Sequence, residues 1–333
     1  MQVRRFFLPL TLRSGWILLL LAVGTVIGYR LHEEGVRHGC FTLSENVIDL
    51  DLQTTELSRI RLAALGDTGT GNTDQKQVAE ALAKVCHKEG CDLVLMLGDN
   101  FYPNGLSGIE DPLFKSVFLD VYRGLKIPVI PVLGNHDVKG SSSAQVLQSL
   151  LHPEWKMPNY TCFFEEEPVR FHGINSNCHL YAWYRLYRDL SGREEQKGNS
   201  LHQQARWTVV FGHHPVYSNG VHGDSGLIQR LVWERLLGDR VDFYLSGHDH
   251  QLAHLSRERG KTQYLVSGAG GAHYRDPEER KNLKDSAAQP HFTHHNNGFL
   301  WMDIVPGKAL SRFYDLSGQV LYETVQTKQD QRQ

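Results

Sequence analysis

The sequence from Asp92 to Tyr102 reads Asp-Leu-Val-Leu-Met-Leu-Gly-Asp-Asn-Phe-Tyr, an apolar run that ends in glycine and aspartate. The apolar part predicts a β-strand, because a short continuous apolar run bounded by turn residues is typical of a strand buried on both faces. Asp99 and Tyr102 lie three residues apart just after it, so a tight loop brings both within reach of one ion. Four more motifs combine glycine with metal-binding side chains, and most also follow an apolar run: Gly66-Asp67-Thr68-Gly69, Gly134-Asn135-His136-Asp137, Gly212-His213-His214-Pro215 and Gly247-His248-Asp249-His250.

Strands and helices are expected to alternate from Arg59 onward. Thr73 and Asp74 can cap a helix that runs to about Lys88, and further helices are expected near Pro112–Leu125 and Leu227–Leu237. A series of βα units predicts an α/β fold with a mostly parallel sheet, whose functional residues lie at the carboxyl ends of the strands. The expected strands, each of which ends at one of the five motifs, are Ile60–Leu65, Asp92–Leu97, Pro128–Leu133, Trp207–Phe211 and Val241–Leu245.

The last third of the sequence has a different pattern. Segments separated by tight turns predict antiparallel strands, which would form a second sheet packed on the first. Residues 141–143 and 191–200 are expected to be surface loops. The folded domain is expected to span residues 59–325, followed by a tail at 326–333. The expected late strands are Thr262–Val266, Gly298–Val305, Leu310–Tyr314 and Gln319–Glu323.

The composition is that of an ordinary globular protein without a charge bias. The 333 residues include 35 Lys and Arg against 37 Asp and Glu, and 41% are hydrophobic. Such a chain can form one large domain or two modest ones. Binding to nucleic acid needs an excess of basic side chains on one face. The balanced charge therefore argues against a nucleic-acid partner.

The N-terminus resembles an export signal. Three arginines, at positions 4, 5 and 13, precede an apolar run from Gly15 to Tyr29. About 15 apolar residues after a basic start suit a secretory signal peptide, whereas a full membrane span usually needs about 20. Ala22-Val23-Gly24 could be a cleavage site, but the apolar run continues past it, as in an uncleaved anchor.

Two interpretations of residues 1–30 therefore remain open, a signal peptide and a signal-anchor transmembrane segment. Residues 31–58 are polar and aperiodic and are read as a linker. Under either interpretation the basic residues stay in the cytoplasm and the rest of the chain is exported. The protein would be secreted, or anchored in a membrane with its folded domain outside the cytoplasm.

The five cysteines do not form a zinc-ribbon pattern, because no two of them are spaced as Cys-x-x-Cys. Cys86 and Cys91 flank an expected helix-to-strand turn, and Cys162 and Cys178 lie near neighbouring strands. One disulfide in an oxidising compartment and a set of small buried thiols are both compatible with this spacing.

The polar side chains of the motifs are those of a hydrolytic site with two metal ions. A carboxylate can bridge two cations, and two histidines separated by one residue point the same way in an extended chain. Two cations would bind phosphate oxygens and lower the pKa of a bound water, and His136 is placed to protonate the leaving group. The candidate ligands are Asp67, Asp99, Tyr102, Asn135, His213, His248 and His250.

This series of motifs resembles the calcineurin-like metallophosphoesterases, and specifically the purple acid phosphatases of the small, tartrate-resistant type. The most specific element is Gly98-Asp99-Asn100-Phe101-Tyr102, because a tyrosine ligand separates purple acid phosphatases from most metallophosphoesterases. Supporting segments are Gly212-His213-His214-Pro215-Val216-Tyr217, His222-Gly223 and Val266-Ser267-Gly268-Ala269-Gly270. The resemblance covers roughly Arg59 to Val305, and it implies a four-layer αββα sandwich of two mixed sheets.

The resemblance also implies a role for each motif residue. Asp99 would bridge two ions, and the phenolate of Tyr102 on Fe(III) would colour the protein. His136 and His222 would stay unligated, contact phosphate and assist proton transfer, and His214 could add a further phosphate contact. Asp67, Tyr102 and His250 would hold Fe(III), and Asn135, His213 and His248 would hold Fe(II), Zn(II) or Mn(II).

The expected activity is that of an acid phosphatase, a hydrolase of phosphate monoesters in which a metal-bound hydroxide attacks phosphorus in line. A phosphodiesterase or nucleotide phosphatase on the same scaffold is the alternative among enzymes. A catalytically inactive, membrane-tethered binding protein is the alternative outside that class, although the intact ligand set argues against it. Ile174-Asn175-Ser176 replaces an acidic strand end common in the family, so substrate selectivity is the least determined property.

Overall fold

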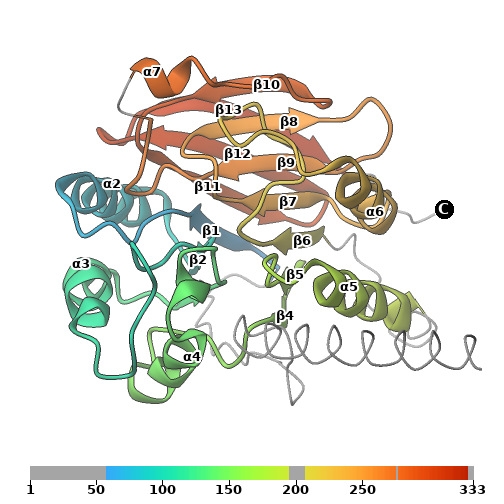
Figure 1. The fold of residues 1–333 in the computed structure, drawn as a ribbon. Coiled ribbons are helices and arrows are strands. Elements are labelled where there is room, and N and C mark those ends of the chain that lie inside the picture. Colours follow the sequence, from blue (N-terminus) through green and yellow to red (C-terminus); the bar gives the residue numbers. More distant parts are fainter. Residues whose placement is uncertain (1–57, 195–206, 275–276, 329–333) are drawn as a thin grey trace, which may run out of the picture.

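In the computed structural model, two β-sheets pack face to face and helices cover their outer surfaces (Figure 1). The structure describes residues 58–194, 207–274 and 277–328. The segment 1–30, and all but the last residue of the expected linker, lie outside this range. None of the helices in the described ranges has the length and apolar character that crossing a membrane requires.

The first sheet has six strands in the order β13-β12-β11-β1-β2-β3. Strands β1, β2 and β3 are parallel, and an antiparallel meander of the last three strands continues the sheet from the other edge of β1. The six strands are β1 (Ile60–Leu65), β2 (Leu93–Met96), β3 (Val129–Pro131), β11 (Gly298–Val305), β12 (Lys308–Asp315) and β13 (Val320–Thr327).

The second sheet has seven strands in the order β10-β8-β9-β7-β6-β5-β4. Strands β9, β7, β6 and β5 are parallel, and β8 and β4 pair antiparallel with the two ends of this group. At the outer edge, β10 pairs antiparallel with β8. The seven strands are β4 (Cys162–Glu166), β5 (Val169–Gly173), β6 (Trp207–Phe211), β7 (Phe243–Ser246), β8 (Leu252–Ser256), β9 (Gln263–Ser267) and β10 (Gln289–His294).

The helices connect the strands, and those that begin at Thr73 and Ser142 have side-chain caps. The first cap is Asn72 and not the expected Thr73 or Asp74: its side chain accepts a hydrogen bond from the backbone N–H of Gln75. The helices are α2 (Thr73–Glu89), α3 (Asp120–Tyr122), α4 (Ser142–Leu151), α5 (His179–Glu194), α6 (Leu227–Leu237) and α7 (Pro277–Arg280), with a π-helical segment at Phe114–Leu119 and 3-10 turns at Arg123–Leu125 and Asp137–Lys139.

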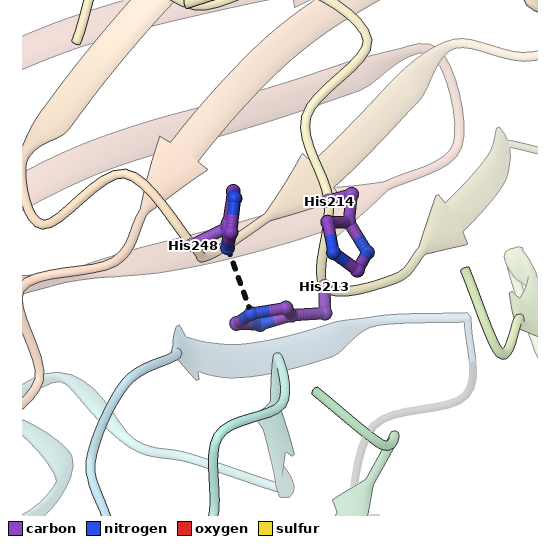
Figure 2. Close-up of side chains that lie close together, drawn as sticks. All are labelled: His213, His214 and His248. Carbon is purple, nitrogen blue, oxygen red and sulfur yellow. Dashed lines mark hydrogen bonds between the residues drawn. The ribbon is translucent and has the colours of Figure 1, made fainter. Parts of the chain in front are cut away.

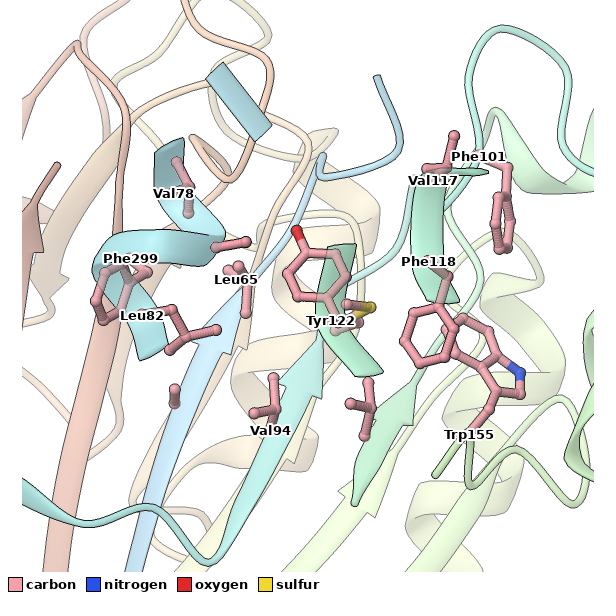
Figure 3. Packing of buried hydrophobic residues seen from close by; sticks show 14 of the residues in the cluster. Leu65, Val78, Leu82, Val94, Phe101, Val117, Phe118, Tyr122, Trp155 and Phe299 are labelled. Carbon is pink, nitrogen blue, oxygen red and sulfur yellow. The ribbon is translucent and has the colours of Figure 1, made fainter. Parts of the chain in front are cut away.

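Alternation along the strands separates three buried cores. Leu62 and Ala64 of β1 point between the two sheets, where they join Phe171 and Val209 of the second sheet. The intervening Ala63 and Leu65 point outward and pack beneath α2 and the helical turns near residue 118 (Figure 3). A third core lies between the second sheet and helices α5 and α6. The predicted αββα sandwich is therefore confirmed.

Several expectations about individual elements were wrong. The strands of the last third do not form a separate sheet: β11–β13 extend the first sheet, whereas β9 joins the second, parallel to β7. A hairpin pattern predicts which strands pair with each other but not which sheet edge is open to them. Ser142 and Ser143 begin helix α4, and the last strand continues to Thr327, two residues into the expected tail.

The cysteines form both disulfides and a free thiol. Cys86 at the end of α2 is bonded to Cys91 just before β2, and Cys178 is also disulfide-bonded. Cys162 is a free, buried thiol, and burial raises its pKa to about 12. The structure thus favours disulfides for the spacing that the sequence left open.

Candidate metal centre

The five sequence motifs meet where strands of both sheets end. The parallel strands of each sheet direct their carboxyl ends to the same edge, so loops from the two sheets face each other there. The structure places Asp67 after β1, Asp99 and Tyr102 after β2, Asn135 and His136 after β3, His213 and His214 after β6, and His248 and His250 after β7.

Three of the candidate ligands have left-handed backbone conformations. Asp67, Asp99 and His248 have φ angles of 58°, 53° and 68°. Non-glycine residues rarely adopt this region and are strained there, which is typical of functional sites. The left-handed turn lets each loop leave its strand sharply. The side chains are thereby directed over the strand ends.

Asp67, Tyr102 and His250 form one group of converging donor atoms. The Tyr102 hydroxyl lies 3.0 Å from Asp67 Oδ1 and 3.4 Å from His250 Nε2. His250 Nε2 lies 3.5 Å from the same carboxylate oxygen. The other oxygen of Asp67 accepts a hydrogen bond from the backbone N–H of His248, which fixes the orientation of the carboxylate.

A second group surrounds His213. Its Nε2 lies 3.0 Å from Asn135 Oδ1, 3.2 Å from His248 Nδ1 and 3.5 Å from Asp99 Oδ2. Its Nδ1 faces the carbonyl oxygen of Leu97 at 2.9 Å. Because a carbonyl can only accept, Nδ1 carries the proton and Nε2 of the neutral ring presents a lone pair. This is the arrangement that orients a metal-binding histidine.

The spacing of both groups fits a coordinated cation. Ligand atoms at about 2.1 Å from a metal lie about 3.0 Å apart in an octahedron and about 3.4 Å apart in a tetrahedron. The six separations given above span 3.0–3.5 Å. In the second group, the lone pair of the neutral His213 ring would face two oxygen acceptors. A cation between them would turn this repulsion into attraction.

The electrostatics of the pocket also favour positive charge. Burial opposes protonation of His213, but the charges of Asp99 and Asp67 outweigh it and raise its pKa. Burial and the surrounding imidazoles lower the pKa of His248 far below its usual value, which keeps the lone pair of one ring nitrogen available. Burial and the carboxylates of Asp67 and Asp99 raise the pKa of Tyr102. A phenolate at this position therefore needs a cation beside it.

The two histidines expected to stay unligated flank these groups. His136 Nδ1 contacts the carbonyl oxygen of Pro103 at 2.6 Å, so Nδ1 carries a proton and Nε2 faces Asp99, 4.0 Å from Oδ2. The ring of His222 stacks on that of His248 with the centroids 4.1 Å apart. The backbone N–H of His222 donates to Asp249 Oδ1, which also accepts from the Tyr274 hydroxyl.

His214 lies beside the second group (Figure 2). Nitrogen atoms of His213, His214 and His248 lie within 4.8 Å of one another. His214 Nδ1, however, contacts the hydroxyl of Ser176 at 2.8 Å. Burial and neighbouring imidazoles lower the pKa of His214 well below its usual value. At neutral pH this ring is therefore an uncharged neighbour of the centre.

Asp137 and Ser176 support the centre, a role that the sequence did not assign to either residue. The buried carboxylate of Asp137 accepts hydrogen bonds from the backbone N–H groups of Asn100, Phe101 and Gly134. The Ser176 hydroxyl accepts from the backbone N–H groups of His213 and His214. Asp137 stands inside a quoted motif, so its position was a usable signal. Ser176 was marked only as part of the departure Ile174-Asn175-Ser176, and its supporting role could not be read from sequence because its partners are more than 30 residues away.

Comparison with known proteins places the chain in a family. Residues 60–252 match the family described as calcineurin-like phosphoesterase. Purple acid phosphatase 7 of Arabidopsis thaliana is 32% identical over 294 residues, which cover 79% of this chain and 85% of that protein. The structure of purple acid phosphatase PPD1 from yellow lupin (Lupinus luteus) seeds matches with a TM-score of 0.62 at 16% identity and covers 82% and 54% of the two chains.

A third relative, known from its structure, has a different kind of description. "GAP50 the anchor in the inner membrane complex of Plasmodium" matches with a TM-score of 0.70 at 23% identity, covering 82% of this chain and 90% of that one. This likeness shows a shared fold. The family match, the phosphatase relatives and the convergent Asp and His side chains together indicate a dimetal phosphoesterase. The chain belongs to the calcineurin-like phosphoesterases and, among them, to the purple acid phosphatases.

Proposed function

We propose that this protein is an acid phosphatase that hydrolyses phosphate monoesters at a centre of two metal ions. The observation that carries the proposal is the presence of two donor groups, each with ligand-like spacing, on either side of Asp99. When bound, two cations would offset the charge of the phosphoryl oxygens and lower the pKa of a water molecule.

The residues divide into two sets of ligands and one shared carboxylate. Asp67, Tyr102 and His250 would hold Fe(III), because a phenol with a raised pKa needs a strongly charged ion to ionise. Fe(II), Zn(II) or Mn(II) would occupy the second position, where nitrogen donors and a neutral amide predominate. Asp99 would serve both ions. The ligands of the second ion would be Asn135, His213 and His248.

The unligated histidines handle the substrate and its proton. With Nδ1 held by Pro103, His136 exchanges a proton only through Nε2, the atom that faces the centre. It would protonate the leaving alkoxide. His222, stacked on His248, would contact the phosphate oxygens. His214 would contribute packing and a neutral hydrogen-bonding edge near the phosphate.

The same proposal includes export of the chain. The basic, then apolar, N-terminal sequence and the disulfide between Cys86 and Cys91 both suit an oxidising compartment outside the cytoplasm. The apolar run past residue 24 favours an uncleaved anchor that tethers the domain to a membrane. Flotation of the full chain with membranes after alkaline extraction would support the anchor. Recovery of a chain shortened by about 24 residues in the soluble fraction would contradict it.

A second candidate function is suggested by the likeness to GAP50, which is described as the anchor in the inner membrane complex of Plasmodium. A chain of this fold could bind a partner at a membrane without catalysis. Metal content distinguishes the two, because a binding role does not need the intact donor set. A chain that purifies without metal and turns over no phosphate ester would favour this candidate.

The decisive experiment combines a visible absorption spectrum with metal analysis and turnover. We expect two metals per chain, a charge-transfer band that disappears in Tyr102→Phe, and faster hydrolysis of p-nitrophenyl phosphate than of bis(p-nitrophenyl) phosphate. Tyr122→Phe is the control, since this buried tyrosine lies outside the centre. A preference for the diester would replace the monoesterase with a phosphodiesterase. A chain without metal would overturn the proposal.

A further inference from the structure

An exposed apolar surface lies on the outer side of helices α5 and α6. The two helices lie side by side over the second sheet (Figure 1), and the rings of Trp183 and Trp233 join them with centroids 6.1 Å apart. The surface, which we call the α5/α6 face, consists of Leu180, Tyr184 and Tyr187 of α5 and Leu227, Ile228 and Leu231 of α6, whose exposed fractions range from 54% to 79%.

The residues of this face are arranged in stripes rather than scattered. Positions 180, 184 and 187 share one side of α5, and positions 227, 228 and 231 share one side of α6. The opposite sides of both helices supply Ala182, Leu186, Leu236 and Leu237 to the buried core. Six of the twelve large apolar side chains exposed in the described ranges belong to this face. Such clustering marks a surface that contacts something apolar.

Exposed positive charges lie beside the face, Arg188 in α5 and Arg235 in α6. The nearby acidic side chains are Asp189, which is half-buried, and Asp239, which is exposed just beyond α6. Glu234 is half-buried and is engaged by the Tyr217 hydroxyl and by Arg257. Tyrosine and arginine both combine an apolar body with a polar end, which suits the boundary between lipid and water. The chemistry fits anionic lipid headgroups over an acyl layer.

We propose that the α5/α6 face rests on the surface of a lipid bilayer. The inference builds on the proposed membrane anchor at the N-terminus. A linker of 27 residues between residues 30 and 58 would span about 30 Å if flexible, compared with a radius of gyration of about 18 Å for a domain of this size. Fully extended, 27 residues reach at most about 90 Å, so the tether permits the α5/α6 face to contact the membrane. The tether raises the effective concentration of lipid, so a weak contact suffices.

The position of the face relates it to the metal centre. Helices α5 and α6 both begin on the side where strands β5 and β6 end, and the ring of His179, the first residue of α5, lies 6.2 Å from that of His214. Leu180, Leu227 and Ile228 thus lie towards the same edge as the candidate centre. A domain that rests on this face keeps its centre close to the lipid–water boundary.

The test uses the full chain in vesicles of phosphatidylcholine and phosphatidylserine, with a single environment-sensitive fluorophore attached to Ile228→Cys. Leu150→Cys on α4 is the matched control, because Leu150 and Ile228 are 79% and 77% exposed and α4 packs against the first sheet. Buried Cys162 should not react, and the treated wild-type chain gives the labelling background. An apolar surface of this kind enters the headgroup region by about 5–10 Å, so brominated lipids should quench the label at 228 but not that at 150.

A second variant separates the face from the anchor. Adding Leu180→Asp and Leu227→Asp to the labelled chain should abolish quenching at 228, while the chain still floats with the vesicles. For the labelled chain without the two aspartates, flotation with no quenching at 228, or with equal quenching at 228 and 150, would overturn the proposal. Loss of flotation altogether would overturn both the anchor and the face. A label at 228 that responds to protein concentration instead of lipid would indicate a second copy of the chain. Turnover of p-nitrophenyl phosphate, followed in parallel, tests the proposed phosphatase independently.

Discussion

The two sheets contribute chemically different halves of the candidate centre. The first sheet supplies mainly oxygen donors, from two carboxylates, a phenol and an amide, whereas the second sheet supplies imidazoles alone. The halves are also supported differently. A buried carboxylate, Asp137, holds three backbone N–H groups of the oxygen half, and one hydroxyl, Ser176, holds two of the nitrogen half. The negative charge of the centre therefore comes from the first sheet, and the second sheet supplies imidazole ligands.

The largest effect should follow from removing the charge that the two halves share. In Asp99→Asn we expect kcat to fall by about 1,000-fold, comparable to removing a main electrostatic contact in other hydrolases. Metal content should fall as well, because both donor groups lie within reach of this carboxylate. Turnover and metal analysis check this. A variant that keeps two metals and more than a tenth of its activity would contradict the bridging role.

Asp137→Ala should destabilise the loops that carry the oxygen ligands, because it removes their shared hydrogen-bond acceptor. It leaves the N–H groups of Asn100, Phe101 and Gly134 without an acceptor, at about 1 kcal/mol or more each. We therefore expect a loss of about 3 kcal/mol in the free energy of unfolding. Asp137→Asn keeps one acceptor oxygen and should cost less. Denaturant titration measures both, and equal losses would show that the hydrogen bonds matter less than the packing.

His222→Ala tests the nitrogen half at its outer edge. Because His222 contacts the centre through ring stacking and not through a donor atom, we expect kcat/KM to fall by about 100-fold, a typical contribution of an acid–base or phosphate-contacting group. Metal content should stay unchanged. His291→Ala is a control, because His291 contacts Ser256 on the far strands of the second sheet. Loss of metal in His222→Ala would instead make this residue a ligand.

Ser176→Ala should have the smallest effect and sharpens the contrast between the supports. Two backbone N–H groups lose an acceptor, and His214 loses its partner. We expect a loss of about 1–2 kcal/mol in unfolding free energy, and a reduction in metal affinity of about tenfold. If this variant proved less stable than Asp137→Ala, Ser176 would be the more important support, and the nitrogen half would depend more on its support than the oxygen half.

Local pattern predicted much of the fold. The bounds expected for β1, β6, β11 and α6 equal those observed, because each is a short apolar or amphipathic run with a clear stop. Helix α5 was missed because its solvent-facing side is also apolar, which weakens the period of 3.6 residues. The assignment of the last strands to sheets was wrong because it depends on pairing between segments more than 200 residues apart.

The same limit applies to the candidate centre. The expected topology was enough to predict that the residues at the strand ends lie near one another, and the structure does bring together both donor groups. Spacing in the sequence does not reveal tautomers or supports. The proton on His213 Nδ1 is determined by Leu97, 116 residues away. The position of His222 depends on two residues that are distant in sequence. Its backbone N–H donates to Asp249, whose carboxylate also accepts from the Tyr274 hydroxyl.

The left-handed conformations of Asp67, Asp99 and His248 have a consequence for the life of the protein in the cell. Each strained residue costs of the order of 1–3 kcal/mol, and bound cations are what would offset that cost. A newly made chain without its ions would open locally at these loops more often than a loaded one. Proteases act on such openings, so the amount of protein that survives would follow the supply of metal.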